Sequence, residues 1–192
     1  MAEPSSRVAW TPETLNFVKK GNADHGKELA GTCAGCHNEG NPAPILEGQL
    51  PTYLYKQLVD YKNGSRKDPS TAMNGLASTL SDQDMADVAA WYSSQKPILG
   101  KGGAKDTTGI VFRGEGKRME PACSSCHGGS GQGEKVDTPS LAGQKAEYLE
   151  KTLLAYKTGA RANDIYSRMR LIASKLSDGE IKQLAEFYSK QD

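Results

Sequence analysis

The chain has 192 residues, enough for one large domain or two small ones, and 36% of them are hydrophobic. This share is low for a self-sufficient core, and halves of about 80 residues would be only marginally stable on their own apolar side chains. The formal net charge of +1 gives no reason to expect a nucleic-acid partner. No apolar run has the length of a transmembrane helix.

The N-terminal segment is polar and shows no secretory signal. Residues 1–21 are expected to form an extension that contains one short helix. Thr11 is placed to cap this helix, Pro12 stands in its first turn, and Gly21 ends it. The helix has no counterpart in the second half of the chain, and its simplest role is to cover one face of a domain.

A second helix, expected to begin at Asn22, leads into Cys33-Ala34-Gly35-Cys36-His37. Two cysteines three apart, followed at once by histidine, are typical of a c-type haem attachment site. On one helical turn, residues i and i+3 share a face, so both sulfurs can reach the two vinyl groups of one porphyrin edge. His37 then lies under the ring, with an imidazole nitrogen free for the iron.

The remainder of the first half predicts loops and two more helices. Pro44 stands in an extended loop after the motif. A helix is expected over residues 52–62, and a polar loop over residues 65–79 carries Met73. The last helix of this half is expected over residues 82–94, where apolar residues recur at helical spacing.

Residues 97–109 are rich in glycine and predict a linker, after which the chain repeats itself. Cys123-Ser124-Ser125-Cys126-His127 is a second attachment motif, and the pattern Pro-x-Leu-x-Gly-Gln occurs at both 44–49 and 139–144. Such regular recurrence predicts two copies of one domain, residues 22–96 and 110–192. No alternating apolar pattern is long enough for a sheet, so the expected fold class is all-α.

The four cysteines allow other interpretations: two disulfides, redox-active pairs or two incomplete zinc sites. None of these explains why histidine follows the second cysteine in both motifs. A zinc site would also need a fourth ligand for each cluster, and His25 is the one histidine left over. We therefore interpret both motifs as haem attachment sites.

A low-spin electron-transfer haem needs a second axial ligand, which in c-type cytochromes is commonly methionine. Met73 lies 36 residues after His37, and Met169 lies 42 residues after His127. Both stand between a Gly-x-Arg turn and the capped final helix of their copy, so both are predicted to be iron ligands. Met85, in contrast, falls within an amphipathic helix and is expected to pack in the core.

Other residues are placed to support the haems. The backbone carbonyls of Pro44 and Pro139 are candidates to accept the second ring N–H of the two motif histidines. Arg66 and Arg161 are candidates to bind the haem propionates, and the alternative is that both are solvent-exposed loop charges. A tyrosine recurs with each arginine: Tyr53 and Tyr148.

This set of motifs, from about Asn22 to Tyr188, resembles the dihaem cytochrome c4 family. The resemblance implies two tandem class I cytochrome c domains related by pseudo-twofold symmetry, each with one covalently bound haem c, and haems close enough to exchange electrons. It also implies a periplasmic protein, soluble or peripherally associated with the membrane. On that reading, the chain is the mature form after removal of its leader.

The expected function is electron transfer, because histidine and methionine on both irons leave no coordination position for a substrate. The resemblance implies redox protein partners: a donor dehydrogenase or cytochrome complex, and an acceptor oxidase or reductase. The N-terminal helix around Trp10 is less typical of the family and leaves a second hypothesis open. The chain would then be the electron-accepting cytochrome subunit of a sulfide or thiosulfate dehydrogenase complex. A haem enzyme in its own right fits less well.

Overall fold

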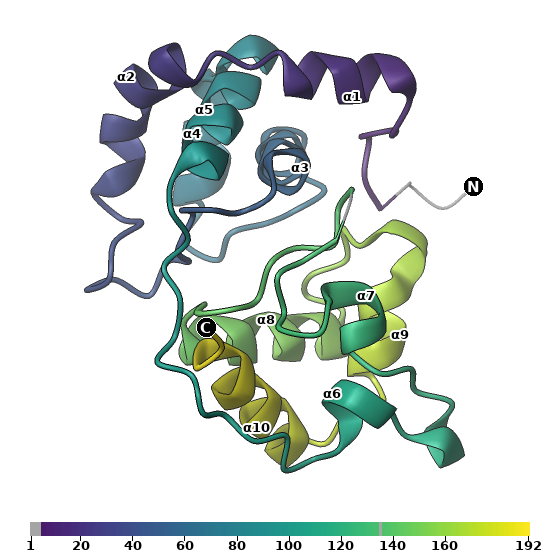
Figure 1. Cartoon of the computed structure of the whole chain (residues 1–192). Coiled ribbons are helices and arrows are strands. Elements are labelled where there is room, and N and C mark those ends of the chain that lie inside the picture. The colour runs from purple at the N-terminus through teal and green to yellow at the C-terminus, as the bar shows by residue number, and fades with distance from the viewer. Residues whose placement is uncertain (1–4, 135) are drawn as a thin grey trace.

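The computed structural model describes residues 5–134 and 136–192, and residues 1–4 of the N-terminal extension lie outside them. Within the described residues the chain is helical, with two isolated β-bridges and no strand, which confirms the expected all-α class. The helices form two groups, one above the other in Figure 1, joined by an extended linker. We call these groups the first and the second domain.

The first domain contains α1 (Pro12–Lys19), α2 (Ala23–Ala34), α3 (Pro51–Lys62), α4 (Ala72–Thr79) and α5 (Asp82–Ser94). Helix α2 crosses α5 at Gly26, where an added Cβ would lie 2.0 Å from the carbonyl oxygen of Asp87. Glycine is required for so close a backbone approach. Met85 and Ala86 are fully buried in the core beneath this crossing, so the predicted packing role of Met85 is confirmed.

Side chains cap the starts of several helices, as the sequence predicted for Thr11. The Thr11 hydroxyl accepts the Thr14 N–H at the start of α1, and the Asn22 side chain accepts two N–H groups at the start of α2. A capping box begins α5 at Ser81, and its counterpart begins the last helix at Ser177.

One predicted loop is wrong in part. Residues 65–79 were expected to lack helix, but Ala72–Thr79 forms α4. The α4 sequence mixes the strong helix formers alanine, methionine and leucine with asparagine and glycine, so its propensity alone does not decide the structure. Side-chain hydrogen bonds to the backbone stabilise the helix. The Asn74 side chain donates to the carbonyls of Tyr61 and Arg66 at 2.8 and 2.9 Å, and the Met73 N–H donates to the Asp68 carboxylate at 3.2 Å.

The second domain contains α6 (Ile110–Arg113), η1 (Gly116–Arg118), α7 (Ser124–His127), α8 (Ala146–Thr158), η2 (Ile165–Ser167), α9 (Arg168–Ala173) and α10 (Asp178–Ser189). The long helix α2 of the first domain is here replaced by the short pieces α6, η1 and α7. Gly114 has a φ of +69° and Pro121 lacks a backbone N–H, so one continuous helix cannot form. Phe112 packs edge-on against Phe187, with ring centroids 5.9 Å apart, and ties α6 to α10.

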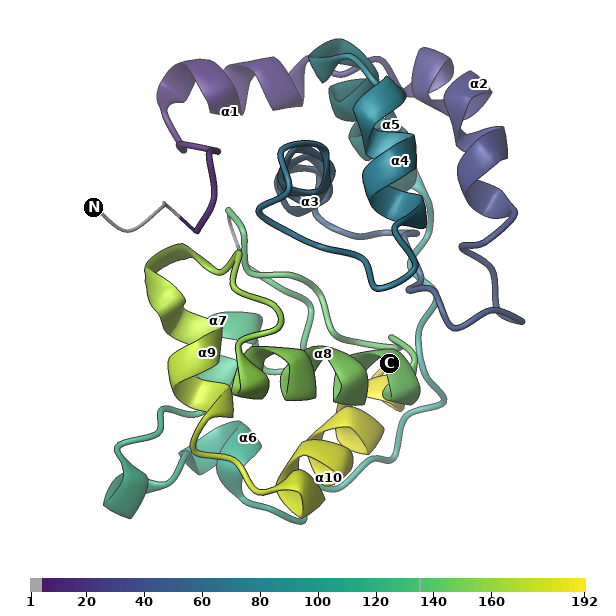
Figure 2. The ribbon, with the colours of Figure 1, turned by 180° about the vertical axis from the view of Figure 1, so that it is seen from behind.

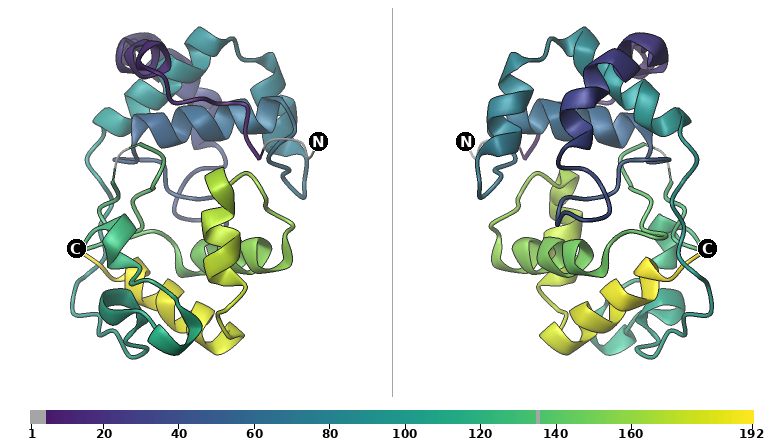
Figure 3. Two further views of the ribbon diagram at one scale, coloured as in Figure 1. Left: turned by 90° about the vertical axis from the view of Figure 1, so that its right-hand side faces the viewer. Right: turned by 90° about the vertical axis from the view of Figure 1, so that its left-hand side faces the viewer.

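The two domains face each other through α3 on one side and the segments before and after α8 on the other (Figures 2 and 3). The linker runs beside the C-terminus, where Gly100 donates to the Gln191 carbonyl at 2.6 Å and Gly102 donates to the Lys190 carbonyl at 2.8 Å. None of the helices in the described part of the chain is both long and apolar enough to cross a bilayer.

Candidate haem sites

Each attachment motif forms one helical turn at the edge of its domain core. The His37 N–H donates to the Cys33 carbonyl at 3.0 Å, and the His127 N–H donates to the Cys123 carbonyl at 2.9 Å. In both motifs the first cysteine is half-buried against the core and the second is exposed, and no disulfide joins any of the four. The two sulfurs of each motif therefore lie one turn apart and remain accessible from outside.

Both motif histidines are buried and oriented by a backbone carbonyl. Nδ1 of His37 donates to the Pro44 carbonyl at 2.8 Å, and Nδ1 of His127 donates to the Pro139 carbonyl at 2.9 Å. The proton on Nδ1 leaves Nε2 as the nitrogen with a free lone pair. Burial lowers the pKa of both imidazoles, which favours the neutral form that a metal requires.

The glycine of each Pro-x-Leu-x-Gly-Gln segment fixes the loop that carries the proline. Gly48 and Gly143 have φ of +71° and +67°, and each N–H donates to the carbonyl of a tyrosine in the last helix of its domain. An added Cβ would lie 2.4 Å from Cγ of Pro97 at Gly48 and 2.2 Å from the Ile98 carbonyl oxygen at Gly143. The linker thus packs on both glycines and holds both loops.

Met73 and Met169 occupy the same place in the two repeats. Each is the second residue of a short helix, α4 or α9, and each helix follows a residue with positive φ, Thr71 at +62° or Ser167 at +56°. Both methionines are half-buried, and Met73 packs against the core of the first domain. The similar local geometry at the two methionines favours a common role for their side chains.

Arg66 and Arg161 point into the domain interface, where Arg161 is buried and Arg66 is half-buried. The Arg66 guanidinium donates to the hydroxyl of Tyr148 at 3.1 Å, and that of Arg161 donates to the hydroxyl of Tyr53 at 3.1 Å. Both also donate to the side-chain oxygen of Gln57, at 2.9 and 3.0 Å. Each arginine therefore meets a tyrosine of the other domain.

These two cations have no acidic partner in the structure. Among residues 5–134 and 136–192, no carboxylate lies within ion-pair distance of either guanidinium. Burial raises the pKa of Tyr148, but Arg66 and Arg161 beside it lower it to about 7. Buried cations are stable when they are paired, so the interface fits the anionic propionates of two haems.

Sequence reasoning missed the residues of the second domain that hold the first attachment loop. The Lys145 ammonium donates to the carbonyls of Asn38, Asn41 and Ala43, at 2.6 Å for Asn41 and 2.7 Å for Ala43. The equivalent residue in the first domain is Leu50, so no repeated pattern marks this contact. It makes the two sites unequal, because no lysine of the first domain occupies that position.

A buried polar cluster on α3 was also missed. Lys56 and Asp60 form an ion pair at 2.7 Å, and both are almost fully buried. Asn163 of the second domain completes the cluster: its carbonyl accepts from Lys56 and its side chain donates to Asp60, each at 2.7 Å. The Ser6 hydroxyl of the N-terminal extension donates to the other Asp60 oxygen at 2.7 Å, so the extension reaches this interface.

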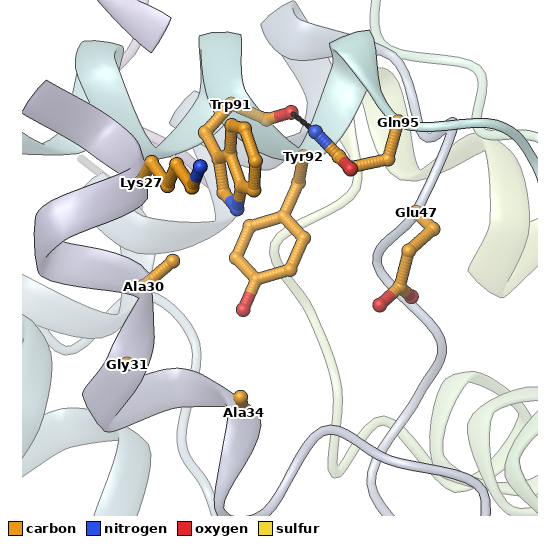
Figure 4. Close-up of a pocket in the computed structure, with 8 residues that line it drawn as sticks. All are labelled: Lys27, Ala30, Gly31, Ala34, Glu47, Trp91, Tyr92 and Gln95. Carbon is orange, nitrogen blue, oxygen red and sulfur yellow. Dashed lines mark hydrogen bonds between the residues drawn. The ribbon is translucent and has the colours of Figure 1, made fainter. Parts of the chain in front are cut away.

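One shallow pocket lies on the first domain between α2 and the end of α5 (Figure 4). Its volume of about 260 Å³ is below the range of about 300–1,000 Å³ that is typical of small-molecule sites. Lys27 lies over the ring of Trp91 on its wall, and Tyr92 lies beside it. None of the predicted haem-site residues lines this pocket, so we assign it no role.

The fold and these two sites define a dihaem c-type cytochrome built from two helical domains. Residues 114–190 match the family model described as cytochrome c, and residues 21–91 match that described as cytochrome c oxidase, cbb3-type, subunit III. Cytochrome c4 of Azotobacter vinelandii is 37% identical over 87% of this chain and 88% of its own length. A thiosulfate dehydrogenase electron acceptor of Stutzerimonas stutzeri is 35% identical over 96% of this chain and 88% of its own.

Among solved structures, reduced recombinant cytochrome c4 from Pseudomonas stutzeri matches with a TM-score of 0.84 and 35% identity, over 90% of this chain and 100% of that chain. The chain belongs to the cytochrome c4 family. It carries two covalently attached haem c groups and functions in electron transfer.

Proposed function

We propose that this protein is a periplasmic electron carrier in which each iron is ligated by one histidine and one methionine: His37 with Met73, and His127 with Met169. The observation that carries the proposal is the duplicated geometry of the two methionines, each at the second residue of a short helix after a positive-φ residue. A bound haem supplies a one-electron ferric/ferrous couple, whose potential a methionine ligand raises.

The other predicted residues hold the haems in place. Cys33 with Cys36, and Cys123 with Cys126, are the thioether positions of the two sites. The carbonyls of Pro44 and Pro139 orient the histidine ligands, as their distances of 2.8 and 2.9 Å from Nδ1 support. Arg66 and Arg161 are the propionate-binding residues.

The arginine positions also support electron exchange between the two haems. Both guanidiniums lie in the domain interface and donate to tyrosines across it. If each binds a propionate, the propionate edges of both haems meet at this interface. An electron that enters through one domain can then leave through the other, and the protein connects a donor to an acceptor that dock on different domains.

The partners of such a carrier are redox proteins: a donor dehydrogenase or cytochrome complex, and an acceptor oxidase or reductase. One observation favours a second candidate, an electron-accepting cytochrome for a sulfur-compound dehydrogenase. The match to the thiosulfate dehydrogenase electron acceptor covers 96% of this chain, so the matched region includes at least part of residues 1–21. The match to Azotobacter cytochrome c4 covers 87%.

The ligand assignment is tested by replacing each methionine with histidine. We expect Met73→His to lower the reduction potential of the haem on the first domain and to leave the second unchanged, because a thioether favours ferrous iron more than an imidazole does. Met169→His should do the reverse. Spectroelectrochemical titration measures both potentials, and an unchanged pair of midpoints in either variant would remove that methionine as a ligand.

The second candidate is tested by the rate at which purified thiosulfate dehydrogenase reduces the oxidised protein. Deletion of residues 1–11 provides the comparison, because it removes the part of the extension that precedes α1 and leaves both haem sites. A large loss of rate after deletion supports a dedicated acceptor. Equal rates, together with intact midpoints, support a general carrier.

A further inference from the structure

In each domain, the peptide that follows the loop proline forms a hydrogen bond at its carbonyl oxygen and another at its N–H. The Pro44 carbonyl accepts from Nδ1 of His37 at 2.8 Å. The N–H of the same peptide, on Ile45, donates to the side-chain oxygen of Gln144 at 2.9 Å, and the Gln144 amide donates back to the Ile45 carbonyl at 2.9 Å. Gln144 belongs to the second domain, so a residue of the second domain contacts the histidine support of the first.

The repeat makes the same connection in the opposite direction. The Pro139 carbonyl accepts from Nδ1 of His127 at 2.9 Å. The Ser140 N–H of that peptide donates to the side-chain oxygen of Gln49 at 2.9 Å, and the Gln49 amide donates to the Ser140 carbonyl at 3.0 Å. Gln49 and Gln144 are 8% and 7% exposed, so water competes little for these bonds.

The chemistry of the peptide gives these contacts an effect on the histidine. The carbonyl and the N–H of one peptide are conjugated, and hydrogen bonds in a chain polarise one another. A bond donated by the N–H makes the carbonyl a better acceptor for the imidazole Nδ1–H. A stronger bond at Nδ1 increases the electron donation of the ring to a metal, which favours the ferric state.

We propose that Gln144 and Gln49 are positioning residues that set the reduction potential of the haem in the opposite domain. Gln144 acts on the haem held by His37, and Gln49 acts on the haem held by His127. The inference rests on the proposed role of these histidines as iron ligands, and not on the methionine assignment. It makes domain docking a determinant of both potentials, since separation of the domains would break both glutamine contacts at once.

Gln144→Met and Gln49→Met test the proposal, because methionine has a similar length but cannot form the paired amide bonds. The potentials are measured by titration followed by NMR, with the ring protons of each histidine ligand identifying each haem. We expect Gln144→Met to raise only the potential of the first-domain haem, and Gln49→Met only that of the second. Only the difference in strength of these bonds between the ferric and ferrous states changes the reduction equilibrium, so we expect a shift of at most about tenfold, and tenfold is 59 mV for a one-electron couple.

Thr52→Val is the matched control. The Thr52 hydroxyl donates across the same interface to the Val136 carbonyl, and it touches neither proline peptide. Its loss removes a hydrogen bond from the interface but none from the peptides that support the histidines. We therefore expect both potentials to equal those of the wild-type protein within experimental error. Amide hydrogen exchange adds a readout independent of the haems: Gln144→Met should expose the Ile45 amide, and Gln49→Met the Ser140 amide.

Equal shifts of both haems in each variant would show that the glutamines serve only to hold the interface, and would overturn the proposal. A shift of the haem in the same domain as the substitution, or no shift despite a deprotected amide, would overturn it as well. Failure of the methionine assignment is separate from these outcomes, because it appears in the optical spectrum of the unmodified protein.

Discussion

The guanidinium of Arg66 donates a hydrogen bond to the hydroxyl of Tyr148 across the domain interface, at 3.1 Å. The repeat forms the reciprocal contact, from Arg161 to Tyr53 at the same distance. Each arginine also stacks on a tyrosine of its own domain, with the guanidinium carbon 4.6 Å from the ring centre. Among the residues that the structure describes, no carboxylate pairs with either cation, which is the basis for proposing both as propionate-binding residues.

Replacement of either arginine should lower a haem potential. In Arg66→Met or Arg161→Met, a positive charge near the haem is lost, and ferric haem, the more positive state, becomes easier to form. We expect a decrease of tens of millivolts, where 59 mV is tenfold for one electron. Spectroelectrochemical titration measures it. Arg113→Met is the control, because Arg113 is exposed on α6. The same change in the control as in both variants would contradict propionate binding.

Removal of Lys145 should loosen the first attachment loop alone. Its ammonium holds three backbone carbonyls between Asn38 and Ala43. Hydrogen bonds to charged groups contribute about 1.5–3 kcal/mol, so Lys145→Met should reduce the free energy of unfolding by roughly that amount in urea titrations. Amide exchange should accelerate over residues 38–44. Lys151→Met, an exposed position on α8, serves as the control.

If residues 38–44 are equally protected from exchange in Lys145→Met and in the wild-type protein, contacts within the first domain are enough to hold the loop. The second attachment loop provides an internal reference, since its Gly133 N–H donates to the His127 carbonyl at 2.8 Å within the same domain. Exchange there should not change in either lysine variant.

His25 should make stability depend on pH. Its Nδ1 lies 2.7 Å from the carboxylate of Asp87, which is 2% exposed. The hydrogen bond to Asp87 raises the pKa of His25 above its ordinary value of 6.5. A raised pKa means that the folded state binds the proton more tightly, so the stabilisation is complete below about pH 6.5 and is lost as the pH rises through the raised value.

The measurement compares the Tm of the wild-type protein and of His25→Gln at several pH values. The wild-type advantage should be largest below pH 6.5 and should shrink above it. An advantage that is constant from acid to alkaline pH would mean that packing, and not the charge of His25, links α2 to α5.

Features that depend on regularly spaced residues within each repeat could be predicted from the sequence. The two CxxCH motifs, the capped helix at 82–94 and the all-α class depend on local patterns of a few residues. The structure confirms the helix and the class, and the relatives support two haem c groups. Helix α4 was missed because Asn74 and Gly75 interrupt its helix formers, and because the contacts of Asn74 with the carbonyls of Tyr61 and Arg66 are not visible in the sequence.

The interface could not be predicted, because its contacts join residues far apart in the chain. Gln144 binds Ile45, 99 residues away, and Lys145 binds Asn38, 107 residues away. The repeated glutamine was visible in both Pro-x-Leu-x-Gly-Gln segments, but its partner was not. Lys145 has leucine as its counterpart, so even the repeat gave no signal.

One optical measurement tests whether each of the two irons has a histidine and a methionine ligand. Methionine-ligated ferric haem gives a weak far-red absorption band, which can be quantified in the oxidised protein against total haem. We expect full intensity for two sites, with half of it lost in Met73→His and half in Met169→His. Half intensity or none in the unmodified protein would rule out this pair of ligand sets, because at least one iron would then be open or differently ligated.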